Sequence, residues 1–354
     1  MSPAVLPSAV ILEALKTVEI RPEALGDLVD FLLRHRFDLS RTVVLCGPGP
    51  SKPYGATVER LLRSAGSQSS LRTEGDGRVD SAEALADELS QTESTLVVAV
   101  GGGRVLDVAK LAAFQAGLPM VAVPTSLAHD GVYSPVASLS SDGVRRSLGT
   151  TAPAALLLDT ALLASAPAAT RRAGVGDLLS NITAVLDWRL ADRCGSDPFL
   201  TESADLALGG VQCYVDVAWS SSTLERVTGL ARGLVLSGLA MSAAGTSRPC
   251  SGAEHLVSHS LDELLAQDAR AHGEQVALGT LLSLAAHGVP DDLVREVFQT
   301  VGLATSPAHL GLSEQLFRVA VERAPQCRPG RHTVLSEVSG RPDRITDLMR
   351  RAYR

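Results

Sequence analysis

Apolar residues in the first 160 positions form short, uninterrupted runs that alternate with amphipathic segments. The runs at residues 42–46, 96–100, 120–123 and 155–158 have strand length, and the segments at 56–65, 81–90 and 105–116 have helical spacing. Valine-rich runs without polar alternation are typical of strands that are buried on both faces. The alternating order therefore predicts an α/β domain with a parallel, doubly wound sheet.

From residue 170 onward the pattern is helical almost throughout. Before that point, residues 136–139 and 145–148 flank Ser141-Asp-Gly143 and predict a hairpin. The expected helices are 178–192, 200–218, 223–244, 254–267, 274–286, 291–301, 313–323 and 342–353. We expect a dinucleotide-binding domain over residues 1–166 and an all-α metal- and substrate-binding domain over 167–354.

Composition excludes several classes of protein. The 354 residues are 45% hydrophobic and 20% charged, as in ordinary globular proteins, and the net charge of −7 without a Lys/Arg run argues against nucleic-acid partners. Residues 1–14 have no basic start and contain Pro3 and Pro7, so no signal peptide is expected. No apolar run reaches the ~20 residues of a membrane span. Five scattered cysteines fit a reducing cytoplasm.

A glycine run, Gly101-Gly-Gly103, follows one predicted strand and precedes a helix. Such a turn lets a phosphate approach the backbone at the positive end of the helix. The run matches neither GxGxxG nor a Walker A loop, so by itself it indicates either a phosphate or dinucleotide site or a structural turn. The polar segment 124–131 follows the next strand, where ligands bind in open α/β sheets.

Three of the eight histidines lie close together in the sequence. His255 and His259 are four residues apart and share a helix face, and His272 precedes the next helix. Two imidazoles and a carboxylate would complete a catalytic zinc site with one open position, and Asp177 is the best candidate for the carboxylate. The alternatives are structural roles: Asp177 could cap a helix that starts at Leu178, and His259 could hydrogen-bond a neighbouring side chain without contacting a substrate. No HExxH pattern is present, which argues against a zincin protease.

Motifs across residues 42–337 resemble the iron-containing alcohol dehydrogenase and dehydroquinate synthase superfamily, specifically its sn-glycerol-1-phosphate dehydrogenase branch. The most specific are Ser247-Arg-Pro-Cys-Ser-Gly-Ala-Glu-His255 and His272-Gly-Glu-Gln275. The other matching segments are 47–52, 101–110, 124–131, 176–188, 237–242 and 328–335.

The resemblance implies a dehydroquinate synthase-like fold and a set of site residues. Asp177, His255 and His272 match the ligands of a divalent metal, usually zinc and alternatively nickel or iron. Asp130 and His259 match substrate contacts, and Asp177 also faces the substrate. The NAD or NADP site is implied at Gly102, Gly103, Arg104, Val105, Asp107, Thr125, Ser126, Ala128 and Ser134. A turn role for Asp130-Gly131 and a helix cap at Asp107 are the structural alternatives.

The family reaction is the reduction of dihydroxyacetone phosphate to sn-glycerol 1-phosphate by NADH or NADPH, and family habit implies a homo-oligomer. Tyr133, Cys250 and His332 depart from the family pattern, so another polyol phosphate or small keto substrate stays open. A sugar-phosphate cyclase and a catalytically silent binding protein are the other readings. Arg145, Arg146 and Arg248 are the candidates for the phosphate-binding group. The product could serve an ether lipid or a specialised metabolite.

Overall fold

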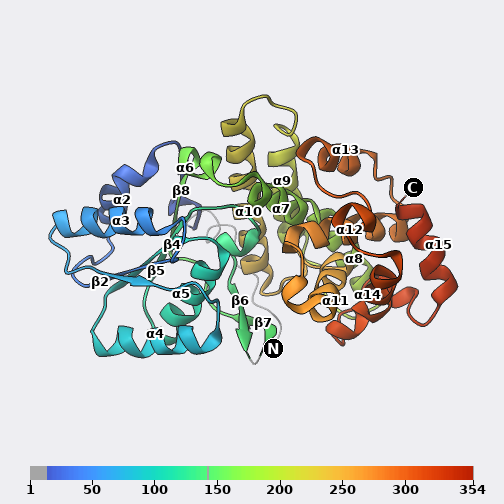
Figure 1. The fold of residues 1–354 in the computed structure, drawn as a ribbon, viewed down its shortest axis with the longest axis horizontal. Helices are drawn as coiled ribbons and strands as arrows, with labels where there is room; N and C mark the ends of the chain where they lie inside the picture. Colours follow the sequence, from blue (N-terminus) through green and yellow to red (C-terminus); the bar gives the residue numbers. More distant parts are fainter. Residues whose placement is uncertain (1–13, 142, 354) are drawn as a thin grey trace. The chain divides into compact units, whose positions relative to one another are not determined.

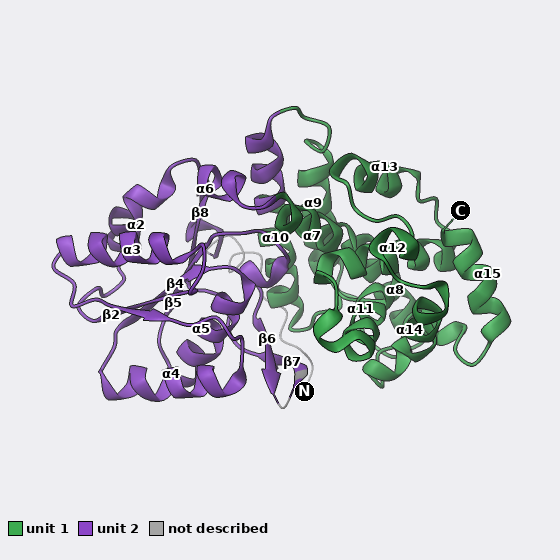
Figure 2. Ribbon diagram, viewed as in Figure 1, with its two compact units in different colours: residues 1–5, 168–221, 232–354 green, residues 6–167, 222–231 purple. Residues whose placement is uncertain are grey.

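The structure is a computed structural model and describes residues 14–141 and 143–353. Residues 1–14, for which no signal peptide is expected, lie outside the described residues except for Ala14. The chain forms two compact units (Figure 2): unit 2 comprises residues 6–167 and 222–231, and unit 1 comprises residues 1–5, 168–221 and 232–354. The predicted assignment of a cofactor domain to 1–166 and a metal domain to 167–354 stays a prediction.

Unit 2 is built on a six-stranded sheet in which every neighbouring pair is parallel. The order is β1-β8-β5-β4-β2-β3. The strands are β1 (Val18–Arg21), β2 (Thr42–Cys46), β3 (Ser70–Thr73), β4 (Leu96–Gly101), β5 (Met120–Pro124) and β8 (Ala155–Asp159). Strands β2, β4, β5 and β8 are completely buried, which confirms the sheet predicted from their apolar runs.

Helices cover both faces of this sheet. Helices α2 (Leu28–Arg34) and α3 (Lys52–Ser64) lie on one face, and α4 (Val79–Gln91) and α5 (Gly103–Ala116) lie on the other (Figure 1). Right-handed crossovers explain the division, because the chain moves toward β3 through α2 and α3 and back toward β5 through α4 and α5. The predicted doubly wound arrangement is therefore confirmed.

A hairpin, a 3-10 turn and a short helix also belong to this unit. Strands β6 (Val136–Ser141) and β7 (Val144–Gly149) form the predicted antiparallel hairpin. A 3-10 turn, η2 (Asp130–Val132), precedes the hairpin, and α6 (Thr160–Ser165) follows β8. The side chain of Asp159 caps α6 by accepting from the backbone N–H groups of Ala161 and Leu162.

Unit 1 is helical, as predicted. Its helices are α7 (Ala168–Leu179), α8 (Asn181–Arg193), α9 (Thr201–Val215), α11 (Ala253–Leu265), α12 (His272–His287), α13 (Asp292–Val301), α14 (Glu314–Cys327) and α15 (Pro342–Ala352). Buried side chains from α11, α12, α14 and α15 form one hydrophobic core, and Trp188 centres another. Helix α10 (Thr223–Ala244) contributes residues to both units.

The predicted helix 178–192 is wrong at its start. The chain forms two helices there, α7 and α8, which are separated at Ser180. Asp177 lies in the last turn of α7, so the alternative in which it caps a helix starting at Leu178 is excluded. Asp107 likewise lies inside α5, whose cap is Gly102.

Helix α10 is long and apolar enough to cross a membrane by length and composition alone. Its best 18-residue window has a mean hydropathy of 1.4, and 78% of that window is buried in the protein. Burial of this kind is typical of the core helix of a folded protein.

Candidate functional site

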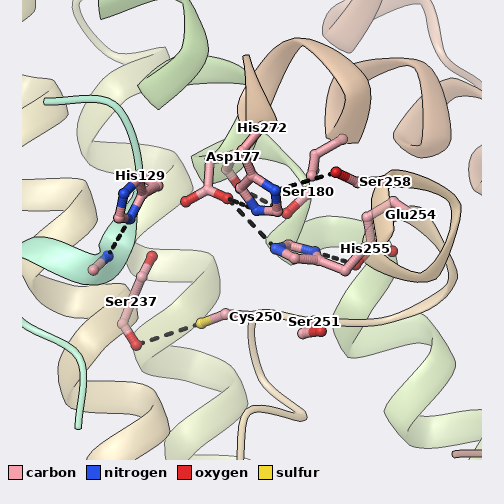
Figure 3. Close-up of polar contacts among 12 residues, drawn as sticks. His129, Asp177, Ser180, Ser237, Cys250, Ser251, Glu254, His255, Ser258 and His272 are labelled. Carbon is pink, nitrogen blue, oxygen red and sulfur yellow. Dashed lines mark hydrogen bonds and ion pairs between the residues drawn. The ribbon is translucent and has the colours of Figure 1, made fainter. Parts of the chain in front are cut away.

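Three helices of unit 1 bring the three predicted metal ligands together. Asp177 ends α7, His255 lies in the first turn of α11, and His272 begins α12. Their side chains point toward one another (Figure 3). Oδ1 of Asp177 lies 3.4 Å from Nε2 of His255 and 3.4 Å from Nε2 of His272.

Two glycines beside the ligands permit this convergence. A Cβ on Gly176 would lie 2.1 Å from the carbonyl oxygen of Gly273, and a Cβ on Gly273 would lie 1.8 Å from that of Ala173. Helices α7 and α12 therefore meet backbone against backbone, at a distance that only glycine allows. This contact sets Asp177 beside His272.

The three side chains fit a divalent metal. An ion with tetrahedral bonds of about 2.1 Å separates its ligand atoms by roughly 3.4 Å, which equals the two distances from Asp177 Oδ1. All three ligand atoms lie within 4.8 Å of one another. Two imidazole nitrogens and one carboxylate oxygen, without a thiolate, suit zinc, nickel or iron.

Each histidine is held through the nitrogen that faces away from Asp177. Nδ1 of His255 lies 3.0 Å from Oε1 of Glu254, which is completely buried. Nδ1 of His272 lies 3.1 Å from Oγ of Ser258. Gln275 steadies that hydroxyl, since its Nε2 donates to Ser258 Oγ at 3.1 Å. Both Nε2 atoms are thereby left for the metal.

The ligands carry opposed charges when no metal is bound. Burial alone would raise the pKa of Asp177, but hydrogen bonds and charge from His255 and His272 outweigh burial and hold its pKa well below the usual range. Burial alone would lower the pKa of His255, but Asp177 and Glu254 raise it to about 10. The site is thus a buried carboxylate that attracts positive charge.

The two predicted substrate contacts lie in different units. His259 lies one turn after His255 on α11, and its ring centroid is 6.3 Å from that of His272. The rings of His255, His259 and His272 therefore lie close together in the structure. Asp130 begins η2 in unit 2. Their contacts with a substrate stay predictions.

The predicted cofactor residues gather at the carboxyl ends of two neighbouring strands. Gly101 of β4 pairs with Pro124 of β5, and the N–H of Thr125 donates to the carbonyl oxygen of Gly101 at 2.9 Å. A Cβ on Gly102 would lie 3.0 Å from Oγ of Ser126, so the glycine turn contacts the polar loop directly. The same loop carries Ala128, and Gly103, Arg104 and Val105 form the first turn of α5.

Two further residues of the predicted cofactor site are buried inside unit 2. Asp107 is 1% exposed and pairs with Lys110, whose Nζ lies 2.8 Å from its Oδ1. Lys110 also donates to the carbonyl oxygens of Gly131 and Val136. Ser134 is 3% exposed and donates to the same carbonyl of Val136 at 3.3 Å. These contacts position the loop around Asp130, and a direct role toward NAD stays a prediction.

Tyr133, Cys250 and Arg248 are buried and contact other parts of the protein. Tyr133 is buried and its hydroxyl donates to the carbonyl oxygen of Ala14 at 3.3 Å. Arg248 is buried, donates to the carbonyl oxygen of His332 and pairs with Asp197. Cys250 lies with its Sγ 3.4 Å from the carbonyl oxygen of Ser237. Arg145 and Arg146 are exposed residues of β7.

Sequence reasoning missed the residues that support the histidines. Glu254, Ser258 and Gln275 were not among the expected site residues. One signal was available, since Glu254 directly precedes a predicted ligand and carboxylates commonly accept the second N–H of a metal-bound histidine. Nothing in the sequence pairs Ser258 with His272, because that contact joins two helices.

Comparisons with known proteins agree with this architecture. A family model described as iron-containing alcohol dehydrogenase matches residues 19–167. Glycerol-1-phosphate dehydrogenase [NAD(P)+] of Hyperthermus butylicus is 37% identical over 84% of this chain and 85% of that protein. The Pyrococcus furiosus protein of the same name is 34% identical over 96% of this chain and 99% of its own length.

Solved structures support the fold. The crystal structure of a probable glycerol dehydrogenase from Sinorhizobium meliloti matches with a TM-score of 0.73 and 23% identity, over 95% of this chain and 96% of that chain. An iron-containing alcohol dehydrogenase from Thermococcus thioreducens matches with a TM-score of 0.71 and 17% identity, over 95% and 97% of the two chains. The extent of the sequence identity to the curated relatives decides the family: this chain belongs to the glycerol-1-phosphate dehydrogenase family of the iron-containing alcohol dehydrogenases.

Proposed function

We propose that the protein is a metal-dependent NAD(P)H oxidoreductase that reversibly reduces dihydroxyacetone phosphate to sn-glycerol 1-phosphate. The relatives named glycerol-1-phosphate dehydrogenase [NAD(P)+] supply the substrate and cofactor class. In this proposal unit 2 holds the dinucleotide and unit 1 holds the metal. Zinc is the proposed ion, with nickel and iron as alternatives.

The observation that carries the proposal is the geometry around Asp177. One of its carboxylate oxygens lies 3.4 Å from an imidazole nitrogen of each of two histidines. Asp177 is at the end of α7, and only glycines allow the backbone of α7 to approach that of α12 so closely. A structural ion pair would need only one histidine. Three converging ligand atoms are what a metal site with an open position requires.

In this proposal different residues bind the metal, the substrate and the dinucleotide. When bound, the metal supplies Lewis acidity at the ketone oxygen and the nicotinamide supplies the hydride. Asp177, His255 and His272 hold the ion, and His259 and Asp130 contact the substrate. The glycine turn and the 125–128 loop bind the dinucleotide at the positive end of α5.

The test is oxidation of NADH and of NADPH with dihydroxyacetone phosphate as the substrate. Protein stripped with a chelator should be inactive, and zinc or nickel should restore turnover. The Asp177→Asn variant should stay inactive or nearly so after metal is added back, because the site has lost its one charged ligand. Metal binding without turnover would leave the site in place and overturn this substrate.

The same assay separates the alternatives. A sugar-phosphate cyclase on this scaffold would use its dinucleotide transiently, whereas a reductase consumes one NAD(P)H for each product formed. Activity with other keto substrates only would assign a different polyol or polyol phosphate. We further propose a cytoplasmic homo-oligomer; the five free cysteines suit a reducing compartment.

A further inference from the structure

A completely buried carboxylate, Glu254, lies directly behind the candidate metal site in unit 1. Its neighbours are helix starts and one metal ligand. Oε1 accepts from the backbone N–H of Gly252 and faces Nδ1 of His255 at 3.0 Å, and Oε2 accepts from Oγ1 of Thr183 at 2.9 Å. Both oxygens therefore have fixed partners, and the carboxylate has one orientation.

We propose that Glu254 is a positioning residue that orients His255 for the metal and makes its imidazole a stronger ligand than that of His272. A carboxylate only accepts hydrogen bonds, so the proton between the two residues resides on Nδ1 and the lone pair on Nε2 faces Asp177. A negative charge behind the ring increases the donor strength of Nε2. The positioning role rests on the proposed function of the site.

The two histidines are supported by different chemistry. His272 has a neutral hydroxyl, Ser258 Oγ, behind its Nδ1, whereas His255 has a charged carboxylate. A hydroxyl can donate or accept, so it fixes the ring less strictly than a carboxylate does. Loss of the hydroxyl should therefore weaken metal binding less than loss of the carboxylate.

A second buried carboxylate provides a matched control. Asp187 is also completely buried and accepts from the N–H of Ala253, at the start of α11, at 2.6 Å. It also accepts from the N–H of Val334 and lies 2.9 Å from Nε2 of His287. Asp187 thus secures the same helix start as Glu254 without contacting a metal ligand.

The carboxylates of Glu254 and Asp187 both pack closely against Gly252. A Cβ on Gly252 would lie 2.6 Å from Oδ2 of Asp187 and 2.9 Å from Oε2 of Glu254. Two buried negative groups held this close together repel each other. The arrangement costs folding free energy, which is expected where geometry serves a ligand site.

The experiment compares metal affinity in the full-length wild type and the Glu254→Gln, Asp187→Asn and Ser258→Ala variants. Zinc affinity is measured by competition with a chromophoric chelator, and the ligand field by the visible absorption of the cobalt(II) form. Glu254→Gln keeps the shape of the side chain. After correction for the proton that His255 releases, which is measured from the pH dependence of each variant, it should weaken zinc binding by about 10- to 100-fold and shift the cobalt spectrum.

The controls separate positioning from folding. Asp187→Asn should lower the melting temperature of the metal-free protein and change zinc affinity by less than about threefold. Ser258→Ala should have an effect between those of the two carboxylate variants. Glu254→Gln with wild-type affinity and spectrum, or with losses no larger than those of Asp187→Asn, would overturn the positioning role.

Two further outcomes are decisive. If Glu254→Gln does not fold, Thr183→Val removes the hydroxyl that holds Oε2 and should weaken zinc binding by about two- to tenfold. Unchanged affinity in folded Thr183→Val would overturn the role. A wild-type protein that binds no metal overturns the proposed metal site and the positioning role together, whereas failure of the variants alone leaves the metal site standing.

Discussion

His255 is the proposed metal ligand whose protonation should govern metal binding. In the metal-free protein Asp177 and Glu254 raise its pKa to about 10, so it carries a proton at neutral pH. A metal binds only the neutral imidazole and must displace that proton. Asp177 stays ionised because its pKa lies well below the usual range, and it adds no pH dependence near neutrality.

Zinc affinity should therefore rise with pH. Below about pH 9 the metal-free protein has His255 protonated, and each unit of increase in pH should strengthen zinc binding about tenfold on account of this residue. Chelator competition at pH 6.5, 7.5 and 8.5 measures the slope. Calorimetry in buffers of different ionisation enthalpy should show at least one proton released per ion. A flat profile would contradict a protonated His255.

The three proposed metal ligands were named from the sequence, but the residues that hold their rings in place were not. Histidines four residues apart on a helix lie on the same face, which drew attention to His255. The motifs that resemble the family indicated Asp177 and His272 as the other ligands. Glu254 and Ser258 act through contacts with the outer nitrogen of a ring, which depend on rotamer and helix packing. The spacing of residues in the sequence predicts neither the side-chain rotamers nor the way the helices pack.

At the level of elements, burial decided which strands were predicted. Strands β4 and β5 are buried on both faces and read as continuous apolar runs. Strands β1 and β3 lie at the two edges of the sheet, where half-exposed positions allow polar residues, and both were missed. Helix α7 was missed because Gly174 and Gly176 weaken its helical signal. Gly176 is needed where α7 meets α12.

The contact between α7 and α12 yields a second prediction. Gly273→Ala places a Cβ against the backbone of Ala173, so the helices must separate and carry Asp177 away from His272. Overpacking of this kind costs about 1–3 kcal/mol of folding free energy, and we expect the displaced ligands to bind zinc more weakly. Gly209→Ala is the matched control, since its helical position in α9 has open space around it, and it should leave zinc affinity unchanged. Equal affinities for the two variants would refute the close-packing argument.

The buried pair of Asp107 and Lys110 yields a third prediction, for the stability of unit 2. Lys110 joins α5 to the carbonyl oxygens of Gly131 and Val136, and it neutralises Asp107. Lys110→Met leaves a buried carboxylate without its cation and should destabilise the protein by about 3–5 kcal/mol in urea unfolding. The double variant Asp107→Asn with Lys110→Met should recover part of that loss. A double variant as unstable as the sum of the single variants would show that the two residues act independently.

For the whole molecule, the proposed metal would link helices within one of the two units. Asp177 of α7 lies far in the sequence from His255 and His272, which belong to the consecutive helices α11 and α12, and all three helices are part of unit 1. An ion that binds only the folded state stabilises it by mass action, about 2.7 kcal/mol at a free concentration 100 times the dissociation constant.

Zinc should thus protect the two units unequally. We expect hydrogen exchange to slow in α7, α11 and α12 when zinc is added to stripped protein, with much smaller changes in β2, β4 and β5. Peptide-level mass spectrometry of exchange resolves these segments. The Asp177→Asn variant serves as the control, because without its carboxylate the same zinc concentration should produce little protection in unit 1. Uniform protection of both units, or protection that persists in Asp177→Asn, would mean that zinc binds elsewhere. Slower exchange confined to α7, α11 and α12 would show that zinc binds at Asp177, His255 and His272.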